Sequence, residues 1–249
     1  MLDTTYIHCP GIGLKTERRL WSAGARTWAD YVALGEDLRL SAGQRERLSP
    51  IIAESLIRLE IGDYAWFARH LPQREHWRAY PVFGDNIAYL DIETTGGMES
   101  SSLTVVGMYD GAEMRQFVRG ENLQDFPDAI AGKAMIVTFF GTGFDLPFLC
   151  RAYGMEFPQL HVDLCFLLKR LGYSGGLKLI EDRLGIERSE ETQGLSGWDA
   201  VRLWEMWRRG NRKALEVLLD YNREDLLNMQ ILLDWAYPRI LAKTLEYEE

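Results

Sequence analysis

The chain has 249 residues, which fits one large domain or a core domain with a smaller appendage. Its composition, 47% hydrophobic and 26% charged, is that of a globular protein with enough apolar material for a core. No apolar run approaches the roughly 20 residues that a membrane-spanning helix needs, and the N-terminus lacks the basic and apolar stretches of a signal peptide. We therefore expect a cytoplasmic protein without a membrane partner; no protein partner can be inferred.

The net charge of −9 argues at first against nucleic acid, because phosphate binding favours a basic surface. The charge is uneven, with a net +1 over residues 1–80 and −10 over the remainder. An enzyme that gathers carboxylates to bind metal ions can be acidic and still act on a polyanion, since the bound cations reverse the local field. The net charge therefore neither supports nor excludes binding to nucleic acid.

Cysteine and histidine give no sign of a disulfide framework or a zinc site. Cys9, Cys150 and Cys165 are far apart and form no C-x-x-C pair, so we expect three reduced side chains. The four histidines are too scattered for a histidine-based metal centre.

Residues 1–80 are predicted to form a small helical region, since apolar residues recur at helical spacing over 48–71 and a break follows at 81–84. Within it, residues 6–35 resemble a helix–hairpin–helix element through the turn Pro10-Gly11-Ile12-Gly13-Leu14-Lys15-Thr16. Gly11 and Gly13 would let the backbone approach a phosphate, and Lys15 begins the helix whose N–H groups would bind it. The alternative is a structural helical hairpin without nucleic acid.

The remainder, residues 81–249, changes to a mixed pattern of strands and helices. Strands are predicted at 86–93, 102–109, 113–118, 134–140 and 161–164, and helices at 123–131, at 145–153 and from 177 to the end with breaks at Gly185 and Gly210. Asp110-Gly111 predicts a hairpin between the second and third strands. The order indicates an α/β fold with a ribonuclease H-like mixed sheet, antiparallel over strands 1–3 and parallel over strands 1, 4 and 5.

Two carboxylates lie on the first of these strands. Asp91 and Glu93 are at i and i+2, so both side chains point to the same face. Side by side on an apolar strand they would repel each other and lose hydration unless a cation compensates. The pattern indicates a metal site, with a water-facing pair at a strand end as the alternative.

A third carboxylate follows the fourth strand. Asp145 follows the turn Gly141-Thr142-Gly143-Phe144 and begins a predicted helix, with Pro147 in its first turn. Taken alone, Asp145 could equally cap that helix.

A fourth carboxylate belongs to the late helical stretch. Tyr221 and Asp225 are at i and i+4 and share one helix face. A surface tyrosine and aspartate on an amphipathic helix would give the same spacing.

In combination, the D-x-E, F-D and Y-x-x-x-D elements resemble the DEDD exonuclease superfamily, specifically its tyrosine-bearing branch, which includes polymerase proofreading domains. The resemblance covers roughly residues 84–235 and is strongest to stand-alone predicted exonucleases with a ribonuclease H-like domain, which share Trp77-Arg78, Leu177-Lys178 and Tyr221–Leu226. The branch with histidine would have it at Asp220, so the tyrosine branch matches better.

The resemblance implies that four carboxylates bind two Mg²⁺ or Mn²⁺ ions, namely Asp91, Glu93, Asp145 and Asp225. It implies that Tyr221 positions the attacking water. Oxygen ligands suit these hard cations, and two ions about 4 Å apart can activate a water and stabilise a leaving oxygen.

Several other residues are candidates for substrate contact. Thr94 and Thr95 are expected to meet the terminal sugar, and Phe144 either stacks on a base or belongs to the core. Related sequences often carry Asn a few positions before the second aspartate, where this chain has Phe139-Phe140, so its grip on the terminal nucleotide is expected to differ. Asp163 either supports the site or ends a strand, and Lys178 either contacts a phosphate or is a solvated helix residue.

We therefore expect a two-metal 3′→5′ exonuclease whose partner is the 3′ end of DNA or RNA. A ribonuclease H-like endonuclease and a non-catalytic nucleic-acid-binding domain are the alternatives. The Y-x-x-x-D element disfavours the first, and retention of the four carboxylates and Tyr221 disfavours the second.

Overall fold

The computed structural model describes residues 1–246, and its centre is a five-stranded mixed sheet of order β3-β2-β1-β4-β5. The strands are β1 (Ile87–Thr94), β2 (Leu103–Tyr109), β3 (Met114–Val118), β4 (Met135–Thr138) and β5 (Leu160–Asp163). β1 pairs antiparallel with β2 and β2 with β3, whereas β1 pairs parallel with β4 and β4 with β5. The predicted mixed sheet is confirmed.

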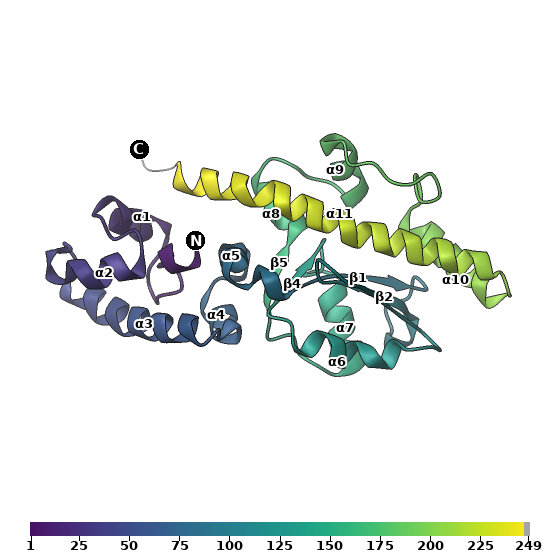
Figure 1. Ribbon diagram of the computed structural model, residues 1–249, viewed down its shortest axis with the longest axis horizontal. Coiled ribbons are helices and arrows are strands. Elements are labelled where there is room, and N and C mark those ends of the chain that lie inside the picture. Colours follow the sequence, from purple (N-terminus) through teal and green to yellow (C-terminus); the bar gives the residue numbers. More distant parts are fainter. Residues whose placement is uncertain (247–249) are drawn as a thin grey trace.

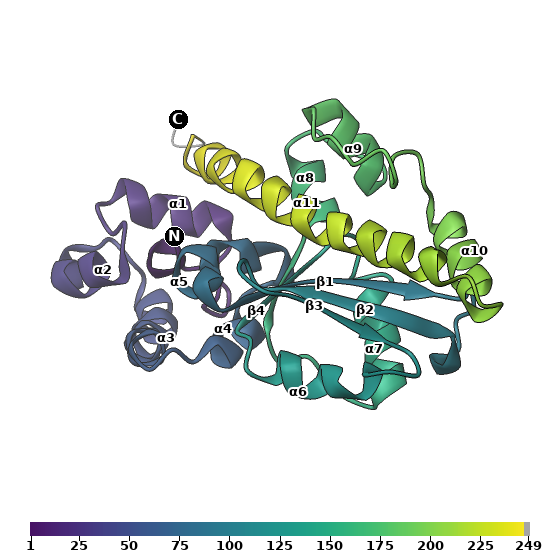
Figure 2. The same cartoon turned by 45° about the vertical axis from the view of Figure 1, so that its right-hand side comes forward.

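Helices cover both faces of this sheet (Figures 1 and 2). The C-terminal part contributes α8 (Leu164–Arg170), α9 (Leu177–Leu184), α10 (Gly197–Arg208) and the 34-residue α11 (Arg212–Leu245), and the opposite face carries α6 (Phe126–Ala131) and α7 (Asp145–Tyr153). Short 3-10 turns η5 (Ser100–Ser102) and η6 (Leu123–Asp125) lie in the connections. α11 runs along β1 and β2 and extends toward the N-terminal helices (Figure 1).

The period-2 alternation of β1 divides its side chains between two cores. Ala88, Leu90 and Ile92 pack with the apolar residues of α6 and α7, while Ile87 and Tyr89 pack on the side of α11. Asp91 and Glu93 continue the second set, so both carboxylates face α11.

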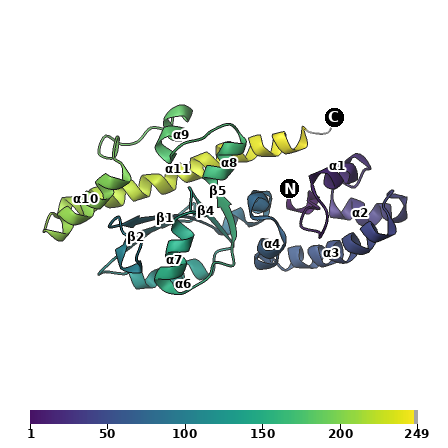
Figure 3. The same ribbon diagram turned by 180° about the vertical axis from the view of Figure 1, so that it is seen from behind.

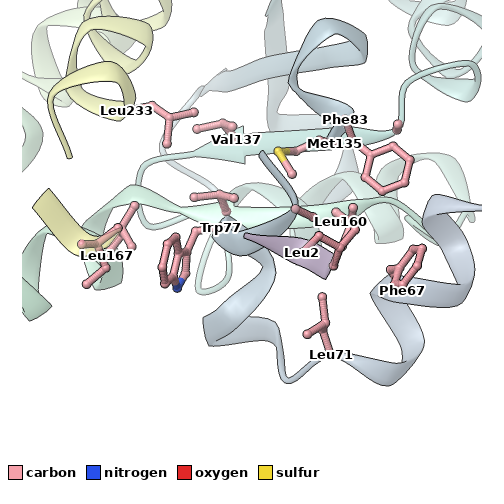
Figure 4. Packing of buried hydrophobic residues seen from close by; sticks show 14 of the residues in the cluster. Leu2, Phe67, Leu71, Trp77, Phe83, Met135, Val137, Leu160, Leu167 and Leu233 are labelled. Carbon is pink, nitrogen blue, oxygen red and sulfur yellow. The ribbon is translucent and has the colours of Figure 1, made fainter. Parts of the chain in front are cut away.

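The N-terminal part is helical, as predicted, and lies at the β4–β5 end of the sheet (Figures 1 and 3). It comprises η1 (Leu2–Thr4), α1 (Leu14–Ser22), α2 (Trp28–Leu34), η2 (Gly35–Asp37), α3 (Ala42–Glu60), α4 (Tyr64–His70), η3 (Gln73–Ala79), α5 (Tyr80–Phe83) and η4 (Gly84–Asn86). Figure 4 shows Phe67, Leu71 and Trp77 of this part packed with Met135 and Leu160 of the sheet. One apolar cluster therefore runs across the boundary that we predict near residue 80.

The glycine turn at the start of α1 has the local shape that the sequence predicts, but it is preceded by only the single turn η1. Gly11 adopts φ +77°, which favours glycine, and Gly13 is the N-cap of α1. Lys15 is exposed in the first turn of α1. Nucleic-acid binding by these three residues stays a prediction.

Several details differ from the sequence prediction. α8 was not predicted, and the fifth strand ends at Asp163 because Leu164 begins this helix. β4 ends at Thr138 rather than at residue 140, because Phe140 takes a left-handed backbone conformation that no strand accommodates. Residues 186–196 after α9 are not helical. Within residues 1–246, no helix is both long and apolar enough to cross a bilayer.

Candidate active site

Asp91 and Glu93 lie at the carboxyl end of β1, where the parallel strands of the sheet stop. Only residues 87–89 of β1 pair with β4, so the end of β1 is open on that side. Glu93 is buried and Asp91 half-buried. Open α/β sheets generally bind ligands at this edge.

α11 brings Tyr221, Asn222 and Asp225 against this end of β1. The Asn222 side chain, fully buried, donates a hydrogen bond from Nδ2 to Oδ2 of Asp91 at 2.8 Å. The close approach depends on Gly107 of β2, the register partner of Asp91, because a Cβ there would lie 2.0 Å from Oδ1 of Asn222. The helix therefore docks on a strand position that only glycine fits.

Three carboxylates meet at this contact. Asp91, Glu93 and Asp225 each offer an oxygen within 4.8 Å of the others. The donors are carboxylates alone, without cysteine or histidine, which is the ligand set that Mg²⁺ and Mn²⁺ prefer. The cluster therefore fits a hard divalent cation.

Asp145 enters the same cleft from the first residue of α7 and is 5% exposed. Its Oδ1 accepts a hydrogen bond from the backbone N–H of Ile92 at 3.2 Å, on the side of β1 that β4 leaves open. Asp145 is the first residue of α7, whose N-cap is Phe144, so Asp145 is not the capping residue. Asp145 lies outside the tight group of three, so its role as a metal ligand stays a proposal.

A cleft of about 550 Å³ joins these groups. Its walls include Asp91, Glu93, Asp145, Tyr221 and Asp225. The five residues that the sequence selects as catalytic therefore share one cavity, although they span 134 positions of the chain from first to last.

Comparison with known proteins places this arrangement in a family. Residues 88–237 match the model of the RNase_H superfamily, and this match covers more than half of the chain. The chain belongs to the RNase H superfamily. A comparison with curated protein sequences found no match.

Solved structures resemble this RNase H superfamily member at low sequence identity. The family B DNA polymerase of the archaeon Pyrobaculum calidifontis is 16% identical with a TM-score of 0.50, over 61% of this chain and 24% of the polymerase. Escherichia coli RNase D, an exoribonuclease involved in structured RNA processing, is 14% identical with a TM-score of 0.42, over 71% and 48%. Brucella melitensis NrnC with bound Mg²⁺ is 18% identical with a TM-score of 0.40, over 67% and 80%. The chain thus spans about a quarter of the polymerase, with which it shares the fold, and about half of RNase D.

The carboxylates of the cleft are buried close together, which disfavours their charged forms. Burial, together with the charge of Asp225, raises the pKa of both Asp91 and Glu93 well above the usual range. Burial likewise raises the pKa of Asp145 to about 7. Cations would relieve both the desolvation and the repulsion.

Two basic side chains partly supply that relief. Arg188 donates from Nη2 to Oδ1 of Asp225 at 2.5 Å and forms a two-point ion pair with buried Glu181, at 2.6 and 2.7 Å. Lys178 lies 3.7 Å from Oδ1 of Asp225. Burial raises the pKa of Asp225, while the charges of Lys178 and Arg188 oppose the shift.

Lys178 also donates a hydrogen bond to the hydroxyl of Tyr221 at 2.6 Å. Lys178 therefore belongs to the site rather than to a solvated helix face, and its contact with a phosphate stays a prediction. Burial and the neighbouring charges of Asp225 and Glu93 raise the pKa of Tyr221. Its phenol stays protonated at neutral pH and can donate a hydrogen bond into the cleft.

Of the three residues predicted to contact substrate, two line the cleft and one does not. Thr94 and Phe144 line the cleft, but the Phe144 ring is half-buried and packs on Phe148 at 5.9 Å between ring centroids. Thr95 is not part of the cleft wall; its backbone N–H donates to the carbonyl of Ser102 at 2.9 Å. Contacts of these residues with substrate stay a prediction.

Asp163, at the end of β5, acts on the site through a loop. Its carboxylate accepts the backbone N–H groups of Phe140 at 2.9 Å, Thr142 at 3.0 Å and Cys165 at 3.1 Å. It thereby fixes the loop that leads into Asp145 and caps α8.

Sequence reasoning missed Asn222 and Arg188 as members of the site. Asn222 stands inside the Y-x-x-x-D motif, one residue after Tyr221 and three before Asp225, so it shares a helix face with Asp225. Arg188 comes from the irregular stretch after α9. A signal existed for Asn222, because an amide within an otherwise apolar helix face needs a buried partner; no comparable signal marks Arg188.

Proposed function

We propose that the chain is a metal-dependent 3′→5′ exonuclease that removes nucleotides from the 3′ end of DNA or RNA. The observation that carries the proposal is the meeting of Asp91, Glu93 and Asp225 within 4.8 Å, in one cleft with Asp145 and the protonated hydroxyl of Tyr221. A purely structural role does not require three carboxylates, two of them buried, to face one another.

In this proposal Asp91, Glu93, Asp145 and Asp225 hold two Mg²⁺ or Mn²⁺ ions. Such a pair of ions, when bound, would lower the pKa of a water and stabilise the oxygen that leaves the phosphorus. Asn222 fixes the rotamer of Asp91 through its hydrogen bond. Arg188 restrains Asp225 from the side of α9.

Tyr221 orients the water whose oxygen attacks the terminal phosphodiester. Its phenol keeps its proton and donates a hydrogen bond, while Lys178 donates to the phenol oxygen and holds it in place. The bond between phosphorus and the 3′ oxygen breaks, giving a nucleoside 5′-monophosphate and a strand with a new 3′ hydroxyl.

The test uses the purified full chain with single- and double-stranded DNA and RNA, each free or blocked at its 3′ or 5′ end. We expect stepwise shortening from free 3′ ends in Mg²⁺ or Mn²⁺ and none in EDTA. Asp145→Ala should lose this activity, while Asp128→Ala, an exposed carboxylate on α6, should retain it. Internal cuts in end-blocked substrates would favour an endonuclease, and absence of any metal-dependent cleavage would leave a binding domain.

A further inference from the structure

Phe140 combines backbone strain with exposure at the mouth of the cleft. It adopts φ +64°, and within residues 1–246 it is the only residue other than glycine with a positive φ. Bulky residues rarely adopt this conformation, and it persists where the surroundings enforce it, often at functional sites. The side chain is nevertheless 50% exposed and lines the cleft that holds the carboxylates.

The loop around Phe140 keeps its ring in one position. Asp163 accepts the N–H of Phe140, and the ring lies so close to Gly143 that a Cβ there would be 2.8 Å from its Cζ. Gly141 is equally confined, because its Cβ would meet the Thr138 side chain at 2.2 Å. The exposed ring is therefore presented by a rigid support.

A second exposed ring extends this surface away from the carboxylates. Phe166, in the first turns of α8, is 46% exposed, and its ring centroid lies 6.3 Å from that of Phe140. We call these two side chains the aromatic ledge. It crosses from the end of β4 to the start of α8, along the same sheet edge as the metal-binding carboxylates.

Beyond the ledge lies a separate cavity of about 240 Å³. Phe166 forms one wall, Trp77 and Leu167 supply apolar surface, and Arg74 and Arg170 contribute guanidinium groups. The Trp77 ring and the Arg170 guanidinium are 5.8 Å apart, so Arg170 is held against the cavity.

Two guanidinium groups line this cavity, and its one lining carboxylate, Asp163, already accepts three backbone N–H groups. Three guanidinium groups surround the single carboxylate of Glu75: Arg78 at 2.9 Å, Arg170 at 3.3 Å and Arg74 at 3.9 Å. Arg78 has a second partner in Glu17, but Arg74 and Arg170 have no other carboxylate partner in the described part of the chain. The Arg74 side chain is 74% exposed and available to an anion.

We propose that the aromatic ledge and the arginine cavity form a binding track for single-stranded nucleic acid, occupied by the nucleotides just upstream of the 3′ end. Bases stack on Phe140 and Phe166, and a backbone phosphate meets Arg74 and Arg170. Stacking on a ring requires an unpaired, unstacked base, so the track selects single strands. This inference rests on the proposed nuclease and adds the class of strand that it accepts.

Binding of 5′-labelled oligothymidylates to the full chain, measured by fluorescence anisotropy in Ca²⁺ and in EDTA, tests the track. Phe140→Asn removes the ring but keeps a residue that tolerates positive φ. Phe166→Leu keeps apolar volume without a ring. Each should weaken binding of a ten-nucleotide strand about tenfold, and binding of a dinucleotide by less. Ile61→Ala, at an exposed position after α3, is the control and should bind like the wild type.

Salt dependence tests the arginine cavity separately. Removing one phosphate contact from a single strand lowers the slope of log K against log salt by about 0.7, so Arg74→Gln should show this change. Unchanged binding of the ten-nucleotide strand in both ring variants would overturn the track. So would an equal loss for the dinucleotide, or tighter binding of a blunt duplex than of the single strand.

The two proposals fail in different ways. If the chain binds strands through the ledge but never shortens them, the track stands and the nuclease does not. If it shortens 3′ ends and both ring variants bind and act like the wild type, the nuclease stands and the track is wrong.

Discussion

Asn222 of α11 donates a hydrogen bond to Oδ2 of Asp91 on β1 at 2.8 Å, and the same amide accepts one from Gln116 of β3 at 3.0 Å. Two strands and a helix are thus tied together at Asp91, the first of the carboxylates that we propose to bind metal. The amide leaves Asp91 one preferred orientation.

Asn222→Ala should weaken Mn²⁺ binding about 10–100-fold, because residues that orient a metal ligand typically contribute that much. Isothermal titration of the folded variant measures the effect. Gln116→Ala, which loosens Asn222 without touching Asp91, should give a smaller loss. Gln230→Ala, further along α11, serves as control; wild-type affinity in Asn222→Ala would contradict this role.

Gly107→Ala should destabilise the protein by about 1–3 kcal/mol, the usual cost of overpacking a core. The new Cβ would lie 2.0 Å from Oδ1 of Asn222 and 2.7 Å from Cδ1 of Leu226, so α11 must move away from β2. Metal binding should weaken with it. Gly132→Ala is the matched control, since its φ of −86° and open surroundings accept a methyl group. Chemical denaturation of both variants measures the free energy of unfolding. A Gly107→Ala protein as stable as the wild type would refute the close docking of α11.

Without metal, the protein should lose stability as the pH rises. The folded-state pKa of Asp145, about 7, exceeds its usual value of 3.8, because burial penalises the charged form. The folded state therefore binds the proton more tightly than the unfolded state, and the penalty grows from pH 4 and is complete above pH 7.

Asp145→Asn should accordingly be more stable than the wild type at pH 8 in EDTA, by on the order of 2 kcal/mol, and equal to it near pH 4. Thermal unfolding across this range measures the difference, with Asp128→Asn as control. Addition of Mn²⁺ should reverse the order at pH 8, since only the wild type keeps the full ligand set. If the wild type is instead the more stable protein in EDTA at pH 8, burial does not raise the pKa of Asp145 as proposed.

Tyr221→Phe should lower kcat about 10–100-fold, because a misplaced nucleophile costs this much. The melting temperature should change little, since only the hydroxyl and its hydrogen bond from Lys178 are lost. Tyr237→Phe on the same helix is the control. Wild-type turnover in Tyr221→Phe would exclude the phenol from positioning the water.

The antiparallel pairing of β2 with β3 was predictable from the local Asp110-Gly111 signal. The parallel arrangement of β1, β4 and β5 was predicted only because the order of elements is that of a ribonuclease H-like sheet. Local spacing also predicted that Asp91 and Glu93 share a face. The meeting of Asp225 with them depends on how α11 docks, which the motif resemblance anticipated and residue spacing alone could not. The hydrogen bond from Asn222 to Asp91 joins positions 131 residues apart and depends on a glycine in a third element.

At Phe140 the sequence pattern predicted the wrong local structure. Propensity extends β4 through both phenylalanines, because aromatic residues favour strands. Asp163 instead captures the N–H groups of residues 140 and 142, and the chain turns there. Contacts from β5 outweigh the local preference, and they produce the exposed ring that pattern reading assigned to a strand.

α11 contacts both ends of the molecule. Tyr221 and Asp225 occupy its first half, while Asp234 accepts a hydrogen bond from Tyr80 and Tyr237 packs on Trp77 in the second half. At 1.5 Å of rise per residue, Asp225 and Tyr237 are about 18 Å apart along one helix. The spacing between the N-terminal region and the carboxylates is therefore set by the number of helical residues between them. An insertion of one residue there would lengthen this spacing and rotate the face that carries Tyr221 and Asp225 by about 100°.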